Sequence, residues 1–492
     1  MKQYFLAVDQ STSGTKAIVF SREGKLEHRV DVPHKQYYPR QGWVEHDPEE
    51  IYENTLSGIM QVMEAKQITS DDVICLSLSN QRETTLVWDK HTGKPVYPAI
   101  VWQCSRAEQL CLELQRSGYA NTVQERSGLV LSPYFSAAKA AWILDEVPGV
   151  RERAEQGNLL FGTIDSWLIW NLTGKEHITD FSNAGRTQLF NITEKDWDDE
   201  LLNIFSIPRS MMPRVVSCDH KAGRTDAVDW LDVEIAGISG DSHGAFFAQG
   251  CTEIGRAKAT YGTGSSVMLN VGKKPVMTDG KVVASIGYAL GDEVTYVLEG
   301  NINCTGATIS WLVDELQLIP NAQSAPNIAS EVQDTLGVYL VPAFAGLGAP
   351  YWESGAKAVI SGLTRGAGKA HVVRAAEESI AYQIRDVIDA MEAQSGIFLK
   401  ELRVDGGPTR DRFLMQFQAD MIDAPVERSS MEELSAAGAM YFGGLAMGVW
   451  SSPEELASLR EVEITYKPNM ESSDRERRYA GWQKAVRMVL GS

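Results

Sequence analysis

A short pattern occurs in both halves of the chain: an apolar run, a turn rich in Gly, Ser and Thr, and a second apolar run. The first copy spans Phe5–Phe20 (FLAVDQSTSGTKAIVF) and the second Ala257–Asn270 (AKATYGTGSSVMLN). This pattern predicts a β-hairpin with a tight, hydroxyl-rich tip. Because such a tip presents several backbone N–H groups at close range, it can cradle phosphate oxygens. Two such hairpins predict two facing domains that hold one nucleotide.

Length, composition and charge narrow the class of protein. A chain of 492 residues is too long for one ordinary domain, and 43% hydrophobic with 23% charged residues is typical of a globular protein. The formal net charge of −19 argues against nucleic acid or an anionic membrane surface as a partner. A nucleotide is still compatible with this charge, since a local pocket can oppose the global charge.

The sequence shows no signal for export or membrane insertion. The chain enters a predicted strand at once, without the apolar segment of about 7–15 residues that a signal peptide needs. No stretch approaches the ~18 uninterrupted apolar residues of a membrane helix. The six cysteines form no C-x-x-C pair, which predicts reduced thiols. We therefore expect a cytoplasmic protein.

Strands alternate with helices in both halves of the chain, which predicts α/β domains. The clearest helix is His371–Gln394, where Ile380, Ile384 and Val387 recur at spacings of three and four. The strand pattern restarts at Ala257. We expect two domains, residues 1–248 and 249–492.

An aspartate follows an apolar strand at this predicted junction, in the segment Gly240-Asp241-Ser242-His243. A carboxylate at the end of a strand, in a cleft, is well placed to act as a general base toward a hydroxyl. The alternative, which the local sequence favours, is that Asp241 only caps the helix that follows. His243 is expected to pack or to hydrogen-bond locally.

Other polar and aromatic residues suit a polyhydroxylated ligand. Arg82 and Glu83 follow a strand, so a forked donor and an acceptor can reach one ligand. Trp102 and Tyr134 can form the aromatic wall of a sugar or polyol pocket. The glycines after Asp405 would let a flat ring approach the backbone. The alternatives are a solvated turn for the charged pair, ordinary core packing for the aromatics and a plain turn for the glycines.

The common nucleotide and metal signatures are absent. The sequence has no G-x-x-x-x-G-K-[ST] loop, no G-x-G-x-x-G after the first strand, no protein-kinase signature set and no His/Cys cluster with zinc spacing.

Taken in order, the motifs resemble those of the FGGY carbohydrate kinases, and within that family the members that act on glycerol. The similarity extends from about Phe5 to Trp482 and rests on AVDQSTSGTKA, GWVEHDP, SNQRETTLVW, AIVWQCSR, SGLVLSPYFSAAKAAWIL, FGTIDSWLIWNLTG, SNAGRT, GISGDS, TYGTG, VPAFAGLGAPYW, GLTRG and LRVDGG. The resemblance implies two α/β domains of the actin-like ATPase (ribonuclease H-like) fold, with ATP and acceptor in a central cleft. It also implies a homo-oligomer, either a dimer or a tetramer.

The resemblance assigns a nucleotide side to the cleft. Asp9 would organise Mg²⁺, and Lys16 stands where the glycerol-phosphorylating members have Arg. Ser310 and Asp411 replace a Gln and an Asn at positions that contact the base. The full set that the resemblance places near ATP is Thr12, Ser13, Lys16, Thr263, Gly264, Gly306, Ser310, Gly407 and Asp411.

The acceptor side follows from the same resemblance. Asp241 would take the proton from a terminal hydroxyl, and the acceptor set is Arg82, Glu83, Trp102, Tyr134, Asp241, Ser242 and Ser266. Ser242 and Ser266 stand where the glycerol-phosphorylating members have Gln and Phe, so the pocket should be larger and more polar. Glycerol is the expected acceptor. The alternative is a four- or five-carbon polyol or ketose such as erythritol, ribitol or xylulose, and a remote one is a non-catalytic actin-like ATP-binding protein.

Overall fold

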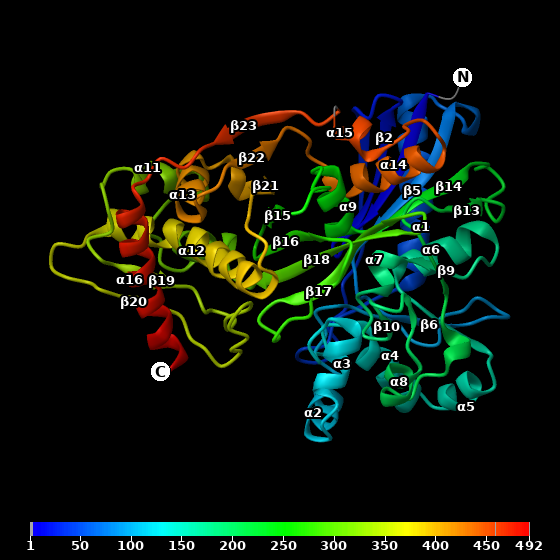
Figure 1. Ribbon diagram of the computed structural model, residues 1–492. Coiled ribbons are helices and arrows are strands. Elements are labelled where there is room, and N and C mark those ends of the chain that lie inside the picture. Colours follow the sequence, from blue (N-terminus) through cyan, green and yellow to red (C-terminus); the bar gives the residue numbers. More distant parts are fainter. Residues whose placement is uncertain (1–2, 458, 492) are drawn as a thin grey trace.

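Two mixed β-sheets organise the chain in a computed structural model that describes residues 3–457 and 459–491 (Figure 1). The first sheet has the order β13 (Lys221–Arg224), β14 (Glu234–Gly240), β5 (Val73–Asn80), β1 (Tyr4–Gln10), β2 (Gly14–Ser21), β3 (Leu26–Pro33). The second has the order β17 (Val283–Leu290), β18 (Glu293–Ile302), β16 (Ser265–Gly272), β15 (Arg256–Tyr261), β21 (Glu401–Asp405), β22 (Val426–Ser429), β23 (Val462–Tyr466).

Both predicted hairpins are confirmed, and they occupy equivalent places in the two sheets. β1 pairs antiparallel with β2, and β15 pairs antiparallel with β16. The first strand of each hairpin also pairs in parallel with a later strand, β5 in one sheet and β21 in the other. Each hairpin tip is thereby held by strands on both sides.

The alternation of side chains along β1 explains why the first sheet is covered on both faces. Leu6 and Val8 pack in the same cluster as Ile59 of α1 (Pro48–Lys66), whereas Phe5 and Ala7 pack on the opposite face. Helix α1 starts where Asp47 accepts a hydrogen bond from the N–H of Glu49 (2.9 Å) and Pro48 fixes the first turn.

The opposite face of the first sheet is covered by a helix from the other end of the chain. Helix α14 (Leu434–Ala446) packs on β14, β5 and α9 (Asp241–Ala248), and in Figure 1 it lies in orange among the blue strands. Trp450 stacks on Phe5 with ring centroids 5.2 Å apart. A single division of the chain at residue 248 therefore leaves α14 outside the half whose sheet it covers.

The predicted long helix is confirmed as α12 (Lys369–Ser395), which is buried between the second sheet and the C-terminal helix α16 (Ser472–Leu490). Tyr382 stacks on Trp482 at 5.4 Å. The buried carboxylate of Asp386 accepts hydrogen bonds from Tyr479 Oη (2.6 Å) and Trp482 Nε1 (2.8 Å). These contacts fasten the end of the chain to the second half.

Further, mostly shorter elements complete both halves. They are β4 (Glu45–His46), β6 (Leu86–Asp89), β7 (Ala99–Ile100), α2 (Glu108–Arg116), α3 (Ala120–Ser127), α4 (Ser136–Glu146), α5 (Val150–Glu155), β8 (Leu159–Gly162), α6 (Ile164–Thr173), β9 (Ile178–Asp180), α7 (Phe181–Ala184), β10 (Phe190–Asn191), β11 (Asp196–Trp197), α8 (Asp199–Ile204), β12 (Arg214–Val216), α10 (Gly306–Asp314), α11 (Ala325–Ala329), β19 (Tyr339–Val341), β20 (Val359–Ser361), α13 (Arg412–Ile422) and α15 (Pro453–Ala457).

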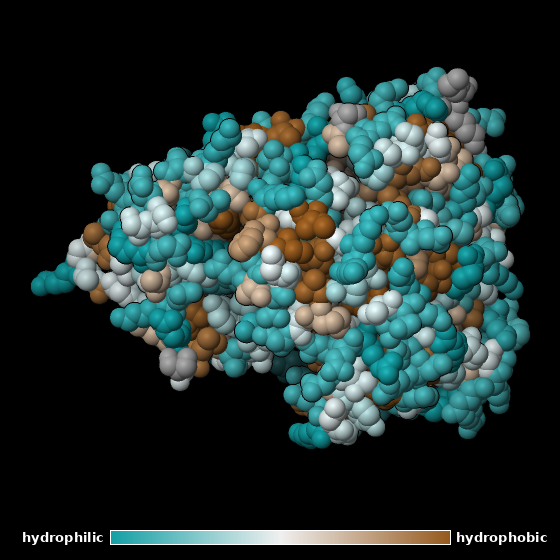
Figure 2. Space-filling model, viewed as in Figure 1, coloured by the Kyte–Doolittle hydropathy of each residue, from teal (hydrophilic) through white to brown (hydrophobic). Residues whose placement is uncertain are grey.

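The visible surface is mostly hydrophilic, and hydrophobic residues gather near the middle of the view, where the two halves meet (Figure 2). Within residues 3–457 and 459–491, every helix falls short of the combined length and apolar character that a membrane crossing requires.

Candidate functional site

A cavity of about 190 Å³ lies where the two halves meet. Its walls come from the first hairpin, the start of α9, strand β15, the end of β21 and the start of α14. Polar side chains dominate the lining, which includes Asp9, Lys16, Asp241, Ser242, Lys258, Thr260, Asp405, Glu432, Glu433 and Ser435. The structure thus brings the predicted base Asp241 together with the predicted metal residue Asp9.

Asp241 is the first residue of α9, directly after the buried strand β14. Its Oδ1 accepts hydrogen bonds from the N–H of Ser242 (2.5 Å) and from Arg82 Nε (3.1 Å), and the side chain is 36% exposed. The carboxylate therefore supports the first turn of the helix and also opens onto the cavity. Gly240 permits this arrangement, because a Cβ there would lie 2.6 Å from Cγ of Arg82.

Arg82 is the centre of a buried ion network. Its Nη1 donates to both carboxylate oxygens of Glu299 (3.1 Å each), and its Nη2 donates to Ser242 Oγ (3.2 Å). Arg186 donates to the same Glu299 through Nη1 (2.7 Å) and to Glu83 through Nε (2.6 Å). The predicted alternative of a solvated surface turn is wrong, because Arg82 and Glu83 are both buried.

Glu299 balances the two guanidinium groups from inside strand β18. Burial alone would raise the pKa of its carboxyl, but Arg186 and Arg82 outweigh burial and lower the pKa to about 2. Ser266 Oγ lies 3.5 Å from Oε1 of Glu299. The predicted acceptor residues Ser242 and Ser266 therefore both border this network.

The two predicted aromatic residues lie together beside the network. Trp102 and Tyr134 pack edge to face with centroids 5.4 Å apart, and Trp102 Nε1 donates to Thr12 Oγ1 at 2.9 Å. Burial raises the pKa of the Tyr134 phenol, and the nearby charge of Glu83 raises it further. The loop that carries Tyr134 is held by the buried ammonium of Lys139, which donates to the carbonyls of residues 133–135 (2.5–3.0 Å).

The first hairpin carries charges at its base. Asp9 is buried, which raises the pKa of its carboxyl to about 6, although Lys16 and the hydroxyl of Ser79 (3.0 Å) favour the ionised form. Lys16 Nζ lies 3.9 Å from Asp9 and 2.8 Å from Glu433, which also pairs with Arg29. Thr12 and Ser13 lie in the turn between β1 and β2.

The tip of the second hairpin contacts the start of helix α10. The carbonyl of Thr263 accepts hydrogen bonds from the N–H groups of Thr305 (2.9 Å) and Ala307 (3.1 Å). Gly306 is required here, because a Cβ would lie 2.5 Å from the carbonyl oxygen of Gly262. Gly264 is likewise packed against the carbonyl of Ile302.

The remaining residues predicted on the nucleotide side have three different settings. Ser310 is exposed on α10. Asp411 caps α13, where its Oδ1 accepts from the N–H of Leu414 (3.0 Å). A Cβ on Gly407 would meet nothing within 4 Å, so the space over this residue is open.

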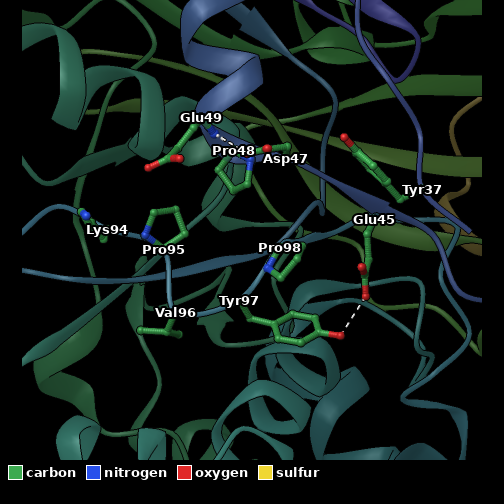
Figure 3. A pocket seen from close by; sticks show the side chains of 10 residues that line it. All are labelled: Tyr37, Glu45, Asp47, Pro48, Glu49, Lys94, Pro95, Val96, Tyr97 and Pro98. Carbon is green, nitrogen blue, oxygen red and sulfur yellow. Dashed lines mark hydrogen bonds between the residues drawn. The ribbon is translucent and has the colours of Figure 1, made fainter. Parts of the chain in front are cut away.

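A larger cavity, of about 600 Å³, lies apart from all the predicted site residues (Figure 3). Its lining includes Tyr37, Pro95 and Pro98, and two of its carboxylates are already paired: Tyr97 Oη donates to Glu45 (2.9 Å), and Asp47 accepts from the N–H of Glu49 (2.9 Å). Proline rings and satisfied carboxylates offer little to a phosphate or a polyol.

Sequence reasoning missed four charged residues of the site, namely Arg186, Lys258, Glu299 and Glu433. Two of them, Lys258 and Glu299, are the buried charges of strands β15 and β18, whose other charged residues, Arg256 and Glu293, begin the strands and are less buried. A charged residue in a buried strand needs a partner or a ligand, so this pattern is a usable signal.

The comparisons with known proteins identify the family. The sequence model described as the FGGY family of carbohydrate kinases, N-terminal domain, matches residues 4–247, and the C-terminal domain model matches residues 257–447. The chain belongs to this family. It is therefore an ATP-dependent phosphotransferase, and the non-catalytic alternative is not supported.

Curated relatives match the chain over nearly its full length. It is 51% identical over 490 residues to glycerol kinase 1 of Thermotoga maritima (99% of each chain). It is 49% identical over 492 residues to glycerol kinase of Symbiobacterium thermophilum (100% of this chain, 99% of the relative).

Solved structures show the same fold. The crystal structure of Plasmodium falciparum glycerol kinase with ADP superimposes with a TM-score of 0.94 at 35% identity and covers 99% of this chain and 98% of that one. A ligand-bound xylulose kinase from Lactobacillus acidophilus superimposes with a TM-score of 0.89 at 19% identity and covers 99% of this chain and 98% of that one. At this identity the similarity supports the fold alone. The predicted two-domain α/β architecture with FGGY topology is confirmed.

Proposed function

We propose that this kinase transfers the γ-phosphoryl group of ATP to a terminal hydroxyl of glycerol, with Asp241 as the general base. The observation that carries the proposal is the position of the Asp241 carboxylate, which opens onto the cavity while Arg82 Nε holds one of its oxygens at 3.1 Å. Relatives named glycerol kinases, at 49–51% identity over almost the whole chain, support glycerol as the acceptor.

The proposed step needs one proton acceptor and no covalent intermediate. The acceptor oxygen forms a bond to the γ-phosphorus, its proton passes to Asp241, and the bond between that phosphorus and the bridging oxygen of ADP breaks. Arg82 orients the base, and Trp102 and Tyr134 would flank the carbon chain. Catalysis then rests on positioning and on stabilisation of charge.

The two hairpin tips would hold the phosphates of ATP. Thr12, Ser13 and Lys16 would act from the first half and Thr263 and Gly264 from the second, while the open space over Gly407 leaves room for the rest of the nucleotide. Gly306, Ser310 and Asp411 stay in the proposed nucleotide set.

The cavity also fits Mg²⁺. Asp9 and Asp241 present carboxylate oxygens there, which suit a hard cation. Within residues 3–457 and 459–491 no group of three or more His, Cys, Asp or Glu forms a metal cluster, so most ligands would be water and phosphate oxygens, as is usual for Mg²⁺. When bound, Mg²⁺ neutralises charge on the β- and γ-phosphates.

The test of the base is Asp241→Asn. Loss of a positioned base should lower kcat about 10²–10⁴-fold while ADP still binds. Asp229→Asn, on the exposed surface, is the matched control and should leave both quantities unchanged. Wild-type kcat in Asp241→Asn would exclude Asp241 as the base.

A larger polyol or ketose is a second candidate acceptor, because Ser242 and Ser266 place two hydroxyl groups on the ion network where further substrate hydroxyls could pair. The test compares kcat/KM for glycerol, erythritol, ribitol and xylulose. A clear preference for glycerol supports the primary proposal, and a preference for a longer substrate that Ser266→Phe abolishes supports the second. A cytoplasmic location and a homo-oligomeric state stay predictions.

A further inference from the structure

A buried lysine lines the cavity without a partner. Lys258 lies in the middle of β15, its exposed fraction is 0%, and its side chain belongs to the cavity wall. Among the residues that the structure describes, its ammonium takes part in no hydrogen bond and no ion pair. Burying a charge in this way is costly, so a group that supplies an acceptor would bind here favourably.

The other cations buried at the site each donate to at least one partner, which sets Lys258 apart, although Nη2 of Arg186 makes no hydrogen bond. Lys139 donates to three carbonyls, and Arg82 and Arg186 each bind carboxylates. Burial lowers the pKa of Lys258, whereas the charges of Asp405 and Asp241 raise it and that of Arg82 lowers it. The ammonium is therefore close enough to the carboxylates for their charges to affect its pKa, but it forms no hydrogen bond or ion pair with them.

A second unsatisfied donor lies on the same face of the strand. Thr260 follows Lys258 by two residues, so both side chains point to the cavity. The hydroxyl Oγ1 of Thr260 is buried and has no hydrogen-bond partner. β15 continues directly into the tip at Thr263 and Gly264, so one strand carries an ammonium, a hydroxyl and the tip amides.

We propose that Lys258, assisted by Thr260, binds an oxygen of the γ-phosphoryl group while that group is transferred. This proposal rests on the proposed function, which brings ATP and the acceptor together in this cavity. The positive charge offsets the repulsion between phosphate oxygens and the carboxylates of Asp9 and Asp241. Lys258 keeps its proton throughout, since the proton of the acceptor passes to Asp241.

The test is Lys258→Met, which keeps most of the length of the side chain and removes the charge. We expect kcat to fall roughly a hundredfold, the usual loss for one donor to a developing charge. Affinity for the β,γ-imido analogue of ATP should fall about tenfold, while affinity for ADP stays the same. The thermal midpoint without nucleotide should hold or rise, because an unpaired buried charge is gone.

Two further variants keep the proposal falsifiable. Lys273→Met removes an exposed lysine, whose side chain is 71% accessible, and should change none of these quantities. Thr260→Val is nearly isosteric and should lower kcat about tenfold. This variant tests the proposal independently if Lys258→Met does not fold.

Three results would overturn the assignment: a lower thermal midpoint with unchanged kcat, an equal loss of affinity for ADP and the analogue, or normal kcat in Thr260→Val when Lys258→Met does not fold. Failure of the proposed acceptor has a different signature. In that case the wild type does not phosphorylate glycerol, yet Lys258→Met still loses affinity for the analogue alone.

Discussion

The two hairpins have the same pairing and the same place in their sheets, but they are supported by different means. The first depends mainly on side chains: Lys16 pairs with Glu433, and Thr12 accepts from Trp102, although its Gly14 also lies close to the carbonyl of Val32. The second depends on close backbone approach at Gly264 and Gly306, which leaves no room for a Cβ. Ion pairs can rearrange when a ligand arrives, whereas backbone contacts cannot. We therefore expect the first tip to be the more adaptable phosphate site and the second the more rigid one.

The largest effect on stability is expected for Gly406→Ala, which disrupts the backbone contacts that support the second hairpin. Gly406 has φ +98°, and an added Cβ would overlap the carbonyl oxygen of Tyr261. Strain and overlap together should cost about 3–5 kcal/mol, measured as a lower midpoint of thermal unfolding. The control is Gly407→Ala, where a Cβ meets open space and stability should be near that of the wild type. Equal midpoints for the two variants would contradict the steric support.

An intermediate effect is expected for Asp9→Asn in the first hairpin. The pKa of Asp9 is raised to about 6 in the fold, so ionisation of this group costs stability, and the cost grows between about pH 4 and pH 6 and then stays constant. Asp9→Asn should therefore stabilise the free protein by about 3 kcal/mol at pH 7.5, with a smaller gain at pH 5. The thermal midpoints at the two pH values measure this gain.

Activity should fall in the same variant, since Asp9 is proposed to hold Mg²⁺. Asp71→Asn, an exposed aspartate, serves as the control and should show no pH-dependent gain. A gain of equal size at both pH values would disprove the raised pKa.

The smallest effect on stability is expected for Lys16→Met. Its partner Glu433 keeps the pair with Arg29, and the side chain of Lys16 is 31% exposed, so the loss should be about 1 kcal/mol or less. The loss of affinity for ADP in Lys16→Met should be larger than this loss of stability. Lys16→Arg, which keeps the charge, should bind ADP as the wild type does. A large drop in the thermal midpoint would show that the first hairpin is as rigidly supported as the second.

Local features of the fold could be predicted from the sequence, whereas its long-range pairs could not. The hairpins and α12 follow from patterns within about 25 residues, because turn chemistry and helical spacing are local. Arg82 and Glu299 are 217 residues apart, and the sequence around either residue does not predict that it pairs with the other. The return of α14 to the first sheet was missed for the same reason, since its apolar surface fits either half.

Asp241 shows why the structural role that the local sequence favours is a poor guide to the function of a residue. Its sequence context favours a helix cap, but Asp241 is the first residue of α9 and Gly240 is the cap, so within the helix the carboxylate accepts only from the neighbouring N–H of Ser242. Only the strand order places the same carboxylate at a cavity opposite Asp9. The structural use of the residue and its proposed chemical use coexist.

The position of α14 also determines how the two halves can move. The chain passes between the sheets three times: after α9, before α14 and between α15 and β23. Three crossings restrict the relative movement of the halves more than a single connection would. A fragment that ends near residue 248 would lack the helix that covers Phe5 and Ala7, and its exposed apolar face would drive aggregation. The protein should therefore resist division into separately expressed halves, although its two family domains are distinct in sequence.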